Sequence, residues 1–343
     1  MKVTRKIKVL IVDDSLLFRE TLAKEIGKDF GIEVIGTAED PFAARDKILK
    51  LKPDVVTLDV EMPKMDGIAF LKKLMPQYPL PVIVVSSVGA NVFEALNAGA
   101  VDFVTKPDTS RPGGMSSFIN ELIVKIKIAS TAKVGSFKKD YEAVKIVSNH
   151  GVDISNTIVA IGASTGGTEA IYNVITALPR DMPGILIVQH MPPVFTKLYA
   201  DRLNNSCRLE VKEAQDGDLV KPGRVLVAAG DFHMRLAKGA SGYYVKCAQG
   251  ERVNGHCPSV DVLFDSVAEI AKSNAIGVIL TGMGADGAKG LLNMRNNGAY
   301  TIGQDEKTST VYGMPMVAYN IGAVAKQLPL DKIPQEICNH LSL

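Results

Sequence analysis

A serine between glycines, at the end of an apolar run, is the first feature of this sequence that could do chemistry. The run Thr157 to Ile161 leads into Gly162-Ala163-Ser164-Thr165-Gly166, a G-x-S-x-G pattern, and a helix-like segment from Thr168 to Ile175 follows. A strand, a sharp turn and a helix in this order can lift the serine hydroxyl above a sheet edge as a nucleophile. The same pattern is also typical of a phosphate-binding loop or of a plain tight turn. The neighbours of Ser164 must decide between the three.

A serine nucleophile needs a base, and His190 is the best placed histidine. It ends the apolar run from Gly184, and the Pro192-Pro193 pair cannot continue a strand. Because parallel strands end at one sheet edge, we expect its imidazole near Ser164. A histidine at a strand end also commonly serves structure alone. The remaining histidines are His150, His233, His256 and His340.

A third polar group follows another apolar run. The run Ala275 to Leu280 leads into a glycine-rich loop that carries Asp286. An aspartate there could orient an imidazole and stabilise its charged form, while the glycines let backbone N–H groups approach an oxyanion. The structural alternative is an Asp-Gly turn in which Asp286 caps the following helix. The order Ser, His, Asp along the chain differs from that of α/β-hydrolases and so predicts a different fold.

Charged side chains gather at predicted strand ends in the first part of the chain. Asp13 and Asp14 follow the first apolar run, Asp59 ends the third, and Lys106 ends the fifth. In an open parallel sheet these ends form the ligand crevice, so the four groups converge. Repelling carboxylates suit Mg²⁺, and a lysine suits a phosphoryl group, which makes Asp59 a candidate phosphoryl acceptor. Asp14 alone is also a plausible helix cap.

The elements that position these groups alternate between strands and helices. A doubly wound parallel α/β sheet is the fold predicted for the first part, which ends in an amphipathic helix from Phe118 to Ala129. The second part, with a hairpin-like region around Arg224 to Val253, is again α/β with a mostly parallel sheet. The five apolar runs of the first part are 7–12, 33–38, 54–60, 81–87 and 102–107.

Length and composition predict two soluble domains. The 343 residues exceed one ordinary domain, and we expect domains at 1–129 and 157–343 joined by the polar, lysine-bearing linker 130–156. No apolar run reaches the ~18 residues of a membrane span, and a net charge of +2 gives no electrostatic case for nucleic acid. The four cysteines lie far apart without a C-x-x-C pair, which indicates neither a zinc site nor disulfides and fits the cytoplasm.

The first part resembles the receiver domain of two-component response regulators. The blocks VLIVDDS, DVVTLDVEMPKMDG, VVSS and DFVTKP carry the resemblance over residues 7–128. It implies that Asp59 is phosphorylated and that a histidine kinase is the phosphodonor. It further implies that Asp13, Asp14, Asp59 and the Glu61 carbonyl hold Mg²⁺, that Ser86 and Phe103 are the switch hydroxyl and aromatic ring, and that Lys106 contacts the phosphoryl group.

The second part resembles the catalytic domain of the chemotaxis protein-glutamate methylesterases, the CheB family. The blocks IGASTGG, VQHMP, NGHCPSVDVLFDSVA and LTGMGADGAKG carry this resemblance. It implies that Ser164 is the nucleophile, His190 the base and Asp286 the orienting acid, with the Met283 N–H as an oxyanion donor. Thr165, Gly166 and His256 are then expected near the pocket, with no cofactor in this domain.

The two resemblances together imply a phosphorylation-activated serine hydrolase. Its expected substrates are glutamyl methyl esters on methyl-accepting chemotaxis receptors, with receptor glutamines as further candidates. Three other functions remain to be weighed. A DNA-binding response regulator would need a basic helix-turn-helix, which the second part lacks. A catalytically silent scaffold and an esterase for a different ester are the other two.

Overall fold

The computed structural model describes residues 5–62, 65–87, 91–107, 114–135, 154 and 156–342. The chain divides into two compact units, Met1–Lys138 and Lys139–Leu343, and each unit is described by itself. Most of the predicted linker, and His150 with it, lies outside the described residues, so the linker stays a prediction. No helix among those described is long and apolar enough to cross a membrane.

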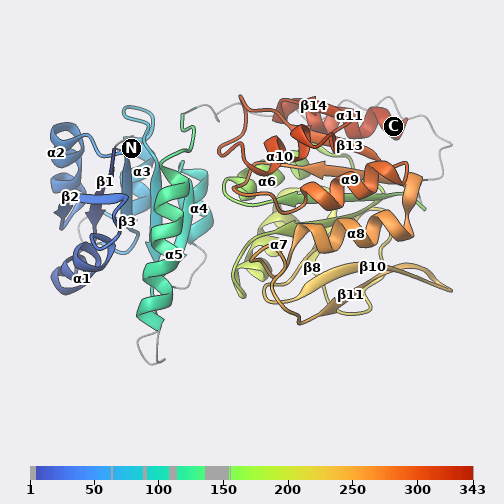
Figure 1. The fold of residues 1–343 in the computed structure, drawn as a ribbon, viewed down its shortest axis with the longest axis horizontal. Coiled ribbons are helices and arrows are strands. Elements are labelled where there is room, and N and C mark those ends of the chain that lie inside the picture. The colour runs from blue at the N-terminus through green and yellow to red at the C-terminus, as the bar shows by residue number, and fades with distance from the viewer. Residues whose placement is uncertain are drawn as a thin grey trace. The chain divides into compact units, whose positions relative to one another are not determined.

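The first unit is built on a five-stranded parallel sheet in the order β2-β1-β3-β4-β5 (Figure 1). The predicted doubly wound sheet is therefore confirmed. Its strands are β1 (Ile7–Val12), β2 (Ile32–Ala38), β3 (Val55–Asp59), β4 (Val82–Ser86) and β5 (Asp102–Thr105). Its helices are α1 (Leu16–Ile26), α2 (Pro41–Leu51), α3 (Gly67–Leu74), α4 (Asn91–Asn97) and α5 (Gly114–Ala129).

Apolar patterning explains these elements. Strands β3 and β4 are buried along their whole length, as expected for central strands covered on both faces. Helix α5 buries Phe118, Leu122 and Ile126, which recur at helical spacing, in a core shared with α1. Helix α1 is capped by Ser15, which accepts a hydrogen bond from the Phe18 N–H, and not by Asp14. Asp14 is therefore free for another role.

The second unit contains a seven-stranded sheet in the order β14-β13-β12-β6-β7-β9-β8. Every strand pair described in it is parallel. The strands are β6 (Ile158–Ala163), β7 (Gly184–Gln189), β8 (Glu210–Glu213), β9 (Arg224–Val227), β12 (Ala275–Ile279), β13 (Tyr300–Gln304) and β14 (Lys326–Leu328).

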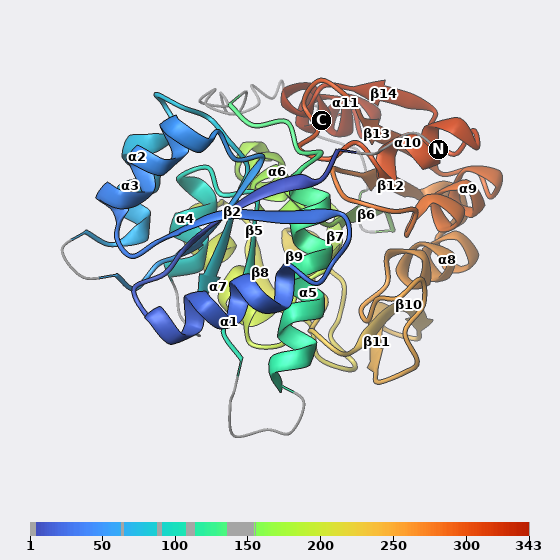
Figure 2. The same cartoon turned by 60° about the vertical axis from the view of Figure 1, so that its left-hand side comes forward.

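Two groups of helices cover this sheet. Helix α8 packs against α9, which contacts α10, and helix α6 contacts α7 and α11. Figures 1 and 2 both draw α8 and α9 side by side. The helices are α6 (Gly167–Ala177), α7 (Phe195–Ser206), α8 (Val260–Ile270), α9 (Ala288–Asn296), α10 (Met314–Asn320) and α11 (Ile333–His340), with short 3₁₀ turns at Lys272–Asn274 and Leu330–Lys332.

The predicted hairpin region divides between two sheets. Strands β10 (His233–Gly239) and β11 (Gly242–Ala248) form an antiparallel hairpin, which packs against α8 in both views. Strand β9, at the start of the same region, joins the large parallel sheet instead. Its apolar residues Val225, Leu226 and Val227 are all buried, which is typical of a strand covered on both faces.

The order of strands creates a crevice beside β6. The chain begins this sheet at β6, moves to β7 on one side, and later returns to β12 on the other side. Such a reversal of strand order leaves a crevice at the carboxyl ends of the strands, where ligands of α/β proteins bind. Ser164, His190 and the loop that holds Asp286 follow β6, β7 and β12 respectively. The topology thus brings the three candidate residues to one edge.

Candidate functional site

Ser164 lies in a tight turn between β6 and α6. Its backbone N–H donates to the Thr281 carbonyl at 3.0 Å, and its carbonyl accepts the Gly167 N–H at 2.6 Å. Gly166 has φ +76°, where a Cβ would also run into the Thr310 side chain. The glycine permits a left-handed turn that other residues adopt only at a cost. Ser164 itself remains half-buried and can meet a substrate.

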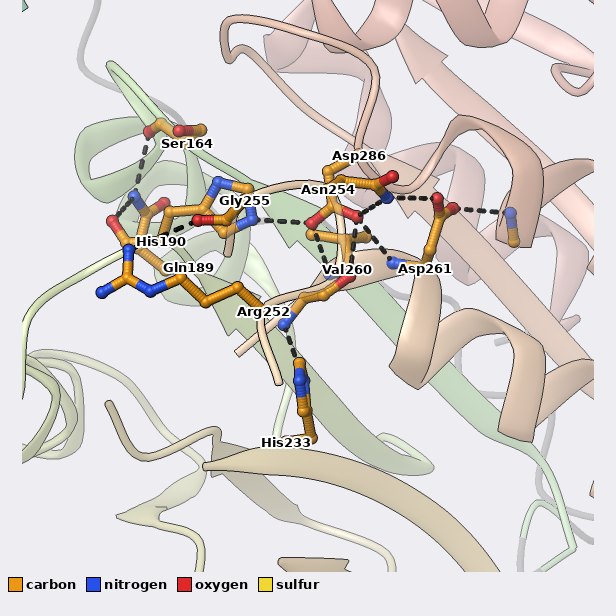
Figure 3. A network of polar contacts seen from close by, with 12 residues as sticks. Ser164, Gln189, His190, His233, Arg252, Asn254, Gly255, Val260, Asp261 and Asp286 are labelled. Atoms are coloured by element: carbon orange, nitrogen blue, oxygen red, sulfur yellow. Dashed lines mark hydrogen bonds and ion pairs between the residues drawn. The ribbon is translucent and has the colours of Figure 1, made fainter. Parts of the chain in front are cut away.

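Gln189 ties the serine turn to the histidine. Its side-chain Nε2 donates to the Ser164 carbonyl at 3.0 Å and to the His190 carbonyl at 3.1 Å (Figure 3). The His190 N–H donates to the Ala163 carbonyl at 3.2 Å. These bonds hold the ends of β6 and β7 together, as expected for strands that pair in parallel. Gln189 falls within the VQHMP block, but its role as a tie between two strand ends was not predicted from the sequence.

His190 and Asp286 form a buried pair. His190 Nε2 lies 2.8 Å from Asp286 Oδ2, and the two side chains are 8% and 1% exposed. Burial works to raise the pKa of Asp286, but hydrogen bonds from His190, Asn254 and Ser259 lower this pKa well below its ordinary value. Because the carboxylate is ionised, Nε2 carries the ring proton and donates a hydrogen bond to Asp286.

The N-terminus of α8 also holds Asp286. The N–H groups of Val260 and Asp261 donate to its carboxylate at 2.7 and 3.2 Å, and the Ser259 hydroxyl donates at 2.7 Å. Partial positive charge at a helix N-terminus favours an anion there. Asp286 therefore caps α8 and not the helix that follows it, where Gly287 is the N-cap. The structural alternative, in which Asp286 caps the helix that follows it, is therefore wrong.

The second ring nitrogen of His190 is placed to act as a base. Nδ1 is buried and has no hydrogen-bond partner in the part of the chain that the structure describes. With the proton on Nε2, Nδ1 is an acceptor. Figure 3 shows Ser164 on the side of His190 that faces away from Asp286. A hydroxyl proton that leaves Ser164 would thus find an acceptor on this side.

Backbone N–H groups near Ser164 are candidates for an oxyanion site. Among the described residues, the Met283 N–H donates to no acceptor, and the Met283 side chain is 45% exposed. The preceding residue, Gly282, approaches the serine so closely that a Cβ on it would lie 2.7 Å from the Ser164 Cβ. Thr165 is buried, and its carbonyl accepts from the Thr281 hydroxyl at 3.0 Å. Met283, Thr165 and Gly166 therefore lie around Ser164, and their roles at an oxyanion site stay predictions.

His256 stacks on His190. The ring centroids are 3.6 Å apart and the planes are inclined by 10°. Burial, together with the neighbouring His190, lowers the pKa of His256 to about 4. His256 is thus a neutral ring at neutral pH, and it reaches the pair from the segment before α8. His256 therefore lies against His190, and its place in a substrate pocket stays a prediction.

The first unit brings together its predicted carboxylates. Carboxylate oxygens of Asp13, Asp14 and Asp59 lie within 4.8 Å of one another. Lys106 Nζ lies 2.6 Å from Asp59 Oδ2 and 3.1 Å from Asp13 Oδ2. The buried Arg19, which the sequence analysis missed, donates to the carbonyls of Asp13 and Asp14 at 2.6 and 2.9 Å. It fixes the backbone of the aspartate pair.

This cluster carries more negative charge than Lys106 neutralises. Burial raises the pKa of Asp59 to about 6, and the nearby Asp13 adds to the effect, although Lys106 opposes it. Asp13 Oδ2 is buried, and Lys106, which it shares with Asp59, is its ion-pair partner. Three clustered carboxylates, of which Asp59 has a raised pKa, fit a divalent cation with oxygen ligands. The receiver site is therefore compatible with Mg²⁺.

The remaining predicted receiver residues lie just after β3 and on β4 and β5. The Glu61 N–H donates to Asp59 Oδ1 at 3.1 Å, which turns the backbone after β3 toward the site. Ser86 ends β4, is buried, and donates its hydroxyl proton to the Ser87 carbonyl at 2.9 Å. Phe103 is buried in β5, and Lys125 Nζ lies 5.1 Å from its ring centroid.

Comparison with known proteins identifies both units. The family model described as CheB methylesterase matches residues 159–337. The chain belongs to the CheB methylesterase family. A second family model, the response regulator receiver domain, matches residues 9–111. The chain thus joins a receiver to a CheB hydrolase domain.

Similar proteins cover nearly the whole chain. A protein-glutamate methylesterase/protein-glutamine glutaminase 2 of Syntrophomonas wolfei is 59% identical over 334 residues, which is 97% of each chain. A protein-glutamate methylesterase/protein-glutamine glutaminase of Escherichia coli O157:H7 is 48% identical and covers 98% of this chain and 97% of its own. The crystal structure of the Thermotoga maritima CheB methylesterase catalytic domain is 43% identical with a TM-score of 0.53, and covers 54% of this chain and 98% of its own.

Proposed function

We propose that this CheB protein is a phosphorylation-activated serine hydrolase that removes methyl groups from glutamyl methyl esters of methyl-accepting chemotaxis receptors and releases methanol. The observation that carries the proposal is the state of His190. Its Nε2 is bound to the ionised Asp286 at 2.8 Å, and its Nδ1 is buried without a partner among the described residues, beside Ser164. This is the arrangement of an orienting acid, a base and a nucleophile.

In the first half of the reaction the serine attacks the ester. The Ser164 hydroxyl oxygen forms a bond to the ester carbonyl carbon while His190 Nδ1 takes its proton. Asp286 stabilises the imidazolium that results and keeps its own charge. The Met283 N–H donates to the developing oxyanion. When the bond to the methoxy group breaks, methanol leaves with the proton that His190 returns.

In the second half water hydrolyses the acyl-enzyme. His190 removes a proton from the water molecule, the hydroxide attacks the acyl carbon, and the bond to Ser164 breaks. The serine regains its proton and the receptor side chain becomes a carboxylate. His256 remains neutral beside the base throughout, because its pKa lies at about 4.

Glutamine side chains are a second substrate class for the same residues. Attack on a γ-amide passes through the same acyl-enzyme and differs only in the leaving group, which is ammonia. The two relatives described above are named for both activities. We therefore include deamidation of receptor glutamines in the proposal.

The receiver controls the hydrolase through Asp59. A chemotaxis histidine kinase supplies the phosphoryl group, which Asp59 accepts beside the Lys106 ammonium. Asp13, Asp14, Asp59 and the Glu61 carbonyl would hold Mg²⁺, whose charge offsets that of the carboxylates and the phosphoryl group when it is bound. Phosphorylation draws Ser86 inward and lets Phe103 repack. We expect residues 130–156 to link the domains at 1–129 and 157–343.

Coupling between the domains takes the form of relief from inhibition. The receiver inhibits the hydrolase until Asp59 is phosphorylated, so that receptor signalling feeds back on receptor modification. A different ester substrate is the enzymatic alternative. The retention of Ser164 at the sheet edge where His190 and Asp286 pair at 2.8 Å counts against a silent scaffold.

Methanol release from methylated receptor membranes tests the chemistry. The full-length protein should release methanol, and Ser164→Ala should not. Ser206→Ala at the end of α7 is the matched control, because that hydroxyl donates only to the Arg202 carbonyl at 2.9 Å. Release by Ser164→Ala would contradict the assigned nucleophile. Hydrolysis of soluble methyl esters without any release from receptor membranes would instead favour the different-ester alternative.

A further inference from the structure

A tight turn before α8 reaches the His190–Asp286 pair and is not used by the mechanism above. Val253 and His256 pair across it, each N–H donating to the other carbonyl at 3.0 Å. Asn254 and Gly255 between them have φ of +54° and +83°. Two left-handed residues in succession form the turn that Asn-Gly pairs adopt at least cost. The backbone of this turn therefore already favours asparagine at position 254.

The side chain of Asn254 bridges two carboxylates. Its Nδ2 donates to Asp286 Oδ1 at 2.8 Å and to Asp261 Oδ2 at 2.7 Å (Figure 3). A side-chain amide nitrogen carries two hydrogens, so each carboxylate receives one of them. Five hydrogen bonds from the described residues reach Asp286, and the one from Asn254 is the only one of the five that comes from this turn.

The two bridged carboxylates would otherwise repel each other. Both are buried, and the Asp261 N–H lies 3.2 Å from Asp286 Oδ1. The other oxygen of Asp261 accepts the Gly290 N–H of α9 at 2.7 Å, which prevents the side chain from turning away. Burial raises the pKa of Asp261, and the charge of Asp286 adds to this. An amide group between two such anions relieves their repulsion.

We infer that Asn254 is a positioning residue of the hydrolase, whose amide separates Asp286 from Asp261 and so keeps Asp286 directed at His190. Asn254 acts through Asp286 and has no contact with the reacting atoms. The inference rests on the proposed function, in which Asp286 orients the base. It adds a requirement at a position that the catalytic triad does not include.

Loss of the amide has a defined electrostatic consequence. Without its two hydrogens the potential at His190 becomes more negative, so the protonated imidazole is favoured and the acidic limb of the pH profile moves to higher pH. Five other ionisable groups surround the bridge besides Asp286 and His190: Asp261 and Asp265 of α8, His256 and Arg252 of the turn, and His233 of β10.

Two substitutions separate the amide from the turn. Asn254→Gly keeps a residue that adopts φ of +54° freely and removes the amide. Asn254→Asp keeps the shape and replaces the donor by a third carboxylate. Asn293→Ala is the matched control, because Asn293 Nδ2 donates to Asp265 Oδ1 at 2.6 Å, an amide-to-carboxylate bond between α9 and α8 that does not reach Asp286.

The rate at which a small fluorophosphonate modifies Ser164 measures the base directly. The full-length proteins are compared from about pH 5 to 9 with Mg²⁺ and a small phosphodonor present, and calorimetry gives the folded fraction. We expect Asn254→Gly to react at least about tenfold more slowly at pH 7, which is the usual scale for a lost hydrogen bond to a charged group. Its acidic limb should lie at higher pH than that of the parent, Asn254→Asp should shift it further, and Asn293→Ala should match the parent.

Two results would overturn the inference. One is an Asn254→Gly protein that reacts at the parental rate with an unshifted acidic limb. The other is a slow reaction of Asn254→Gly whose acidic limb is unshifted and whose lower rate is fully explained by a smaller folded fraction. That result would mean that the turn has a purely structural role. If the parent itself were not modified at Ser164, the proposed function would fail first and this inference with it.

Discussion

Asp286 is ionised because donors from three segments converge on it, and the reactivity of His190 depends on this charge. We expect Asp286→Asn to lower kcat by about 10³- to 10⁴-fold with little change in KM, since an amide does not fix the imidazole tautomer or stabilise the imidazolium. Methanol release under saturating receptor substrate measures the change. Asp265→Asn is the control, because Asp265 lies on α8 but outside the His190–Asp286 pair. A loss of less than tenfold would mean that Asp286 does not orient the base.

Asp59 gives a pH dependence of stability whose sign can be stated. Its pKa in the fold is about 6 against an ordinary 3.8, so ionisation of Asp59 destabilises the receiver. The penalty is absent below about pH 4 and is complete above about pH 6. Asp59→Asn should therefore gain stability relative to the parent as the pH rises from 4 to 7, by about 1–2 kcal/mol. Calorimetry of the receiver transition without Mg²⁺ checks this, and a difference that does not change with pH would refute it.

Mg²⁺ should stabilise the receiver, whereas ionised Asp59 without a cation destabilises it. A cation that binds the folded site stabilises it in proportion to the logarithm of its concentration above Kd. We expect Mg²⁺ to raise the receiver transition temperature of the parent and to raise that of Asp13→Asn much less. Equal shifts in both proteins would place the cation elsewhere.

The strand-turn-helix element around Ser164 depends on one glycine. Gly166 has φ +76°, and a Cβ there would collide with Thr310. Gly217 has φ +83° with nothing within 4 Å of such a Cβ, so Gly217→Ala carries the backbone strain without the collision. We expect Gly217→Ala to lose about 1 kcal/mol of stability and keep its activity, and Gly166→Ala to lose more stability together with most activity. Full activity of Gly166→Ala per folded molecule would show that the turn need not be left-handed.

Long, strongly patterned elements could be predicted from the sequence, and short or polar ones could not. Strands β3, β4, β7 and β12 are buried apolar runs, and their carboxyl ends gave the positions of Asp59, His190 and Asp286. The edge strands β8 and β14 read EVKE and KQL and were not predicted, because their backbone pairs on one side only and their side chains need not be apolar.

Contacts between distant segments were the part of the site that the sequence left open. The Ser259 and Asn254 bonds to Asp286 span 27 and 32 residues. The sequence shows an Asn-Gly pair and a serine before a helix, which predict a turn and a helix cap. Neither pattern predicts that these side chains bind Asp286. The pairing of Asp286 with α8 arises only when α8 and α9 pack together.

At the scale of the whole molecule, the second unit should be a self-sufficient enzyme. It has its own core beneath α8, α9 and α10, and the Thermotoga maritima catalytic domain to which it is similar was crystallised by itself. We expect a chain of residues 157–343 to release methanol without phosphodonor, faster than the unphosphorylated full-length protein, because the inhibiting receiver is gone. A slower rate in the shortened chain, with its fold intact by circular dichroism, would mean that the receiver activates and does not inhibit.

The measurement that tests phosphorylation-gated ester hydrolysis most directly is methanol release from methylated receptor membranes with and without a small phosphodonor and Mg²⁺. The parent, Asp59→Asn and Ser164→Ala proteins are compared at full length. We predict stimulated release by the parent, a basal and unstimulated release by Asp59→Asn, and none by Ser164→Ala. Equal stimulation of the parent and Asp59→Asn, or release by Ser164→Ala, would contradict the assignment of the switch or of the nucleophile.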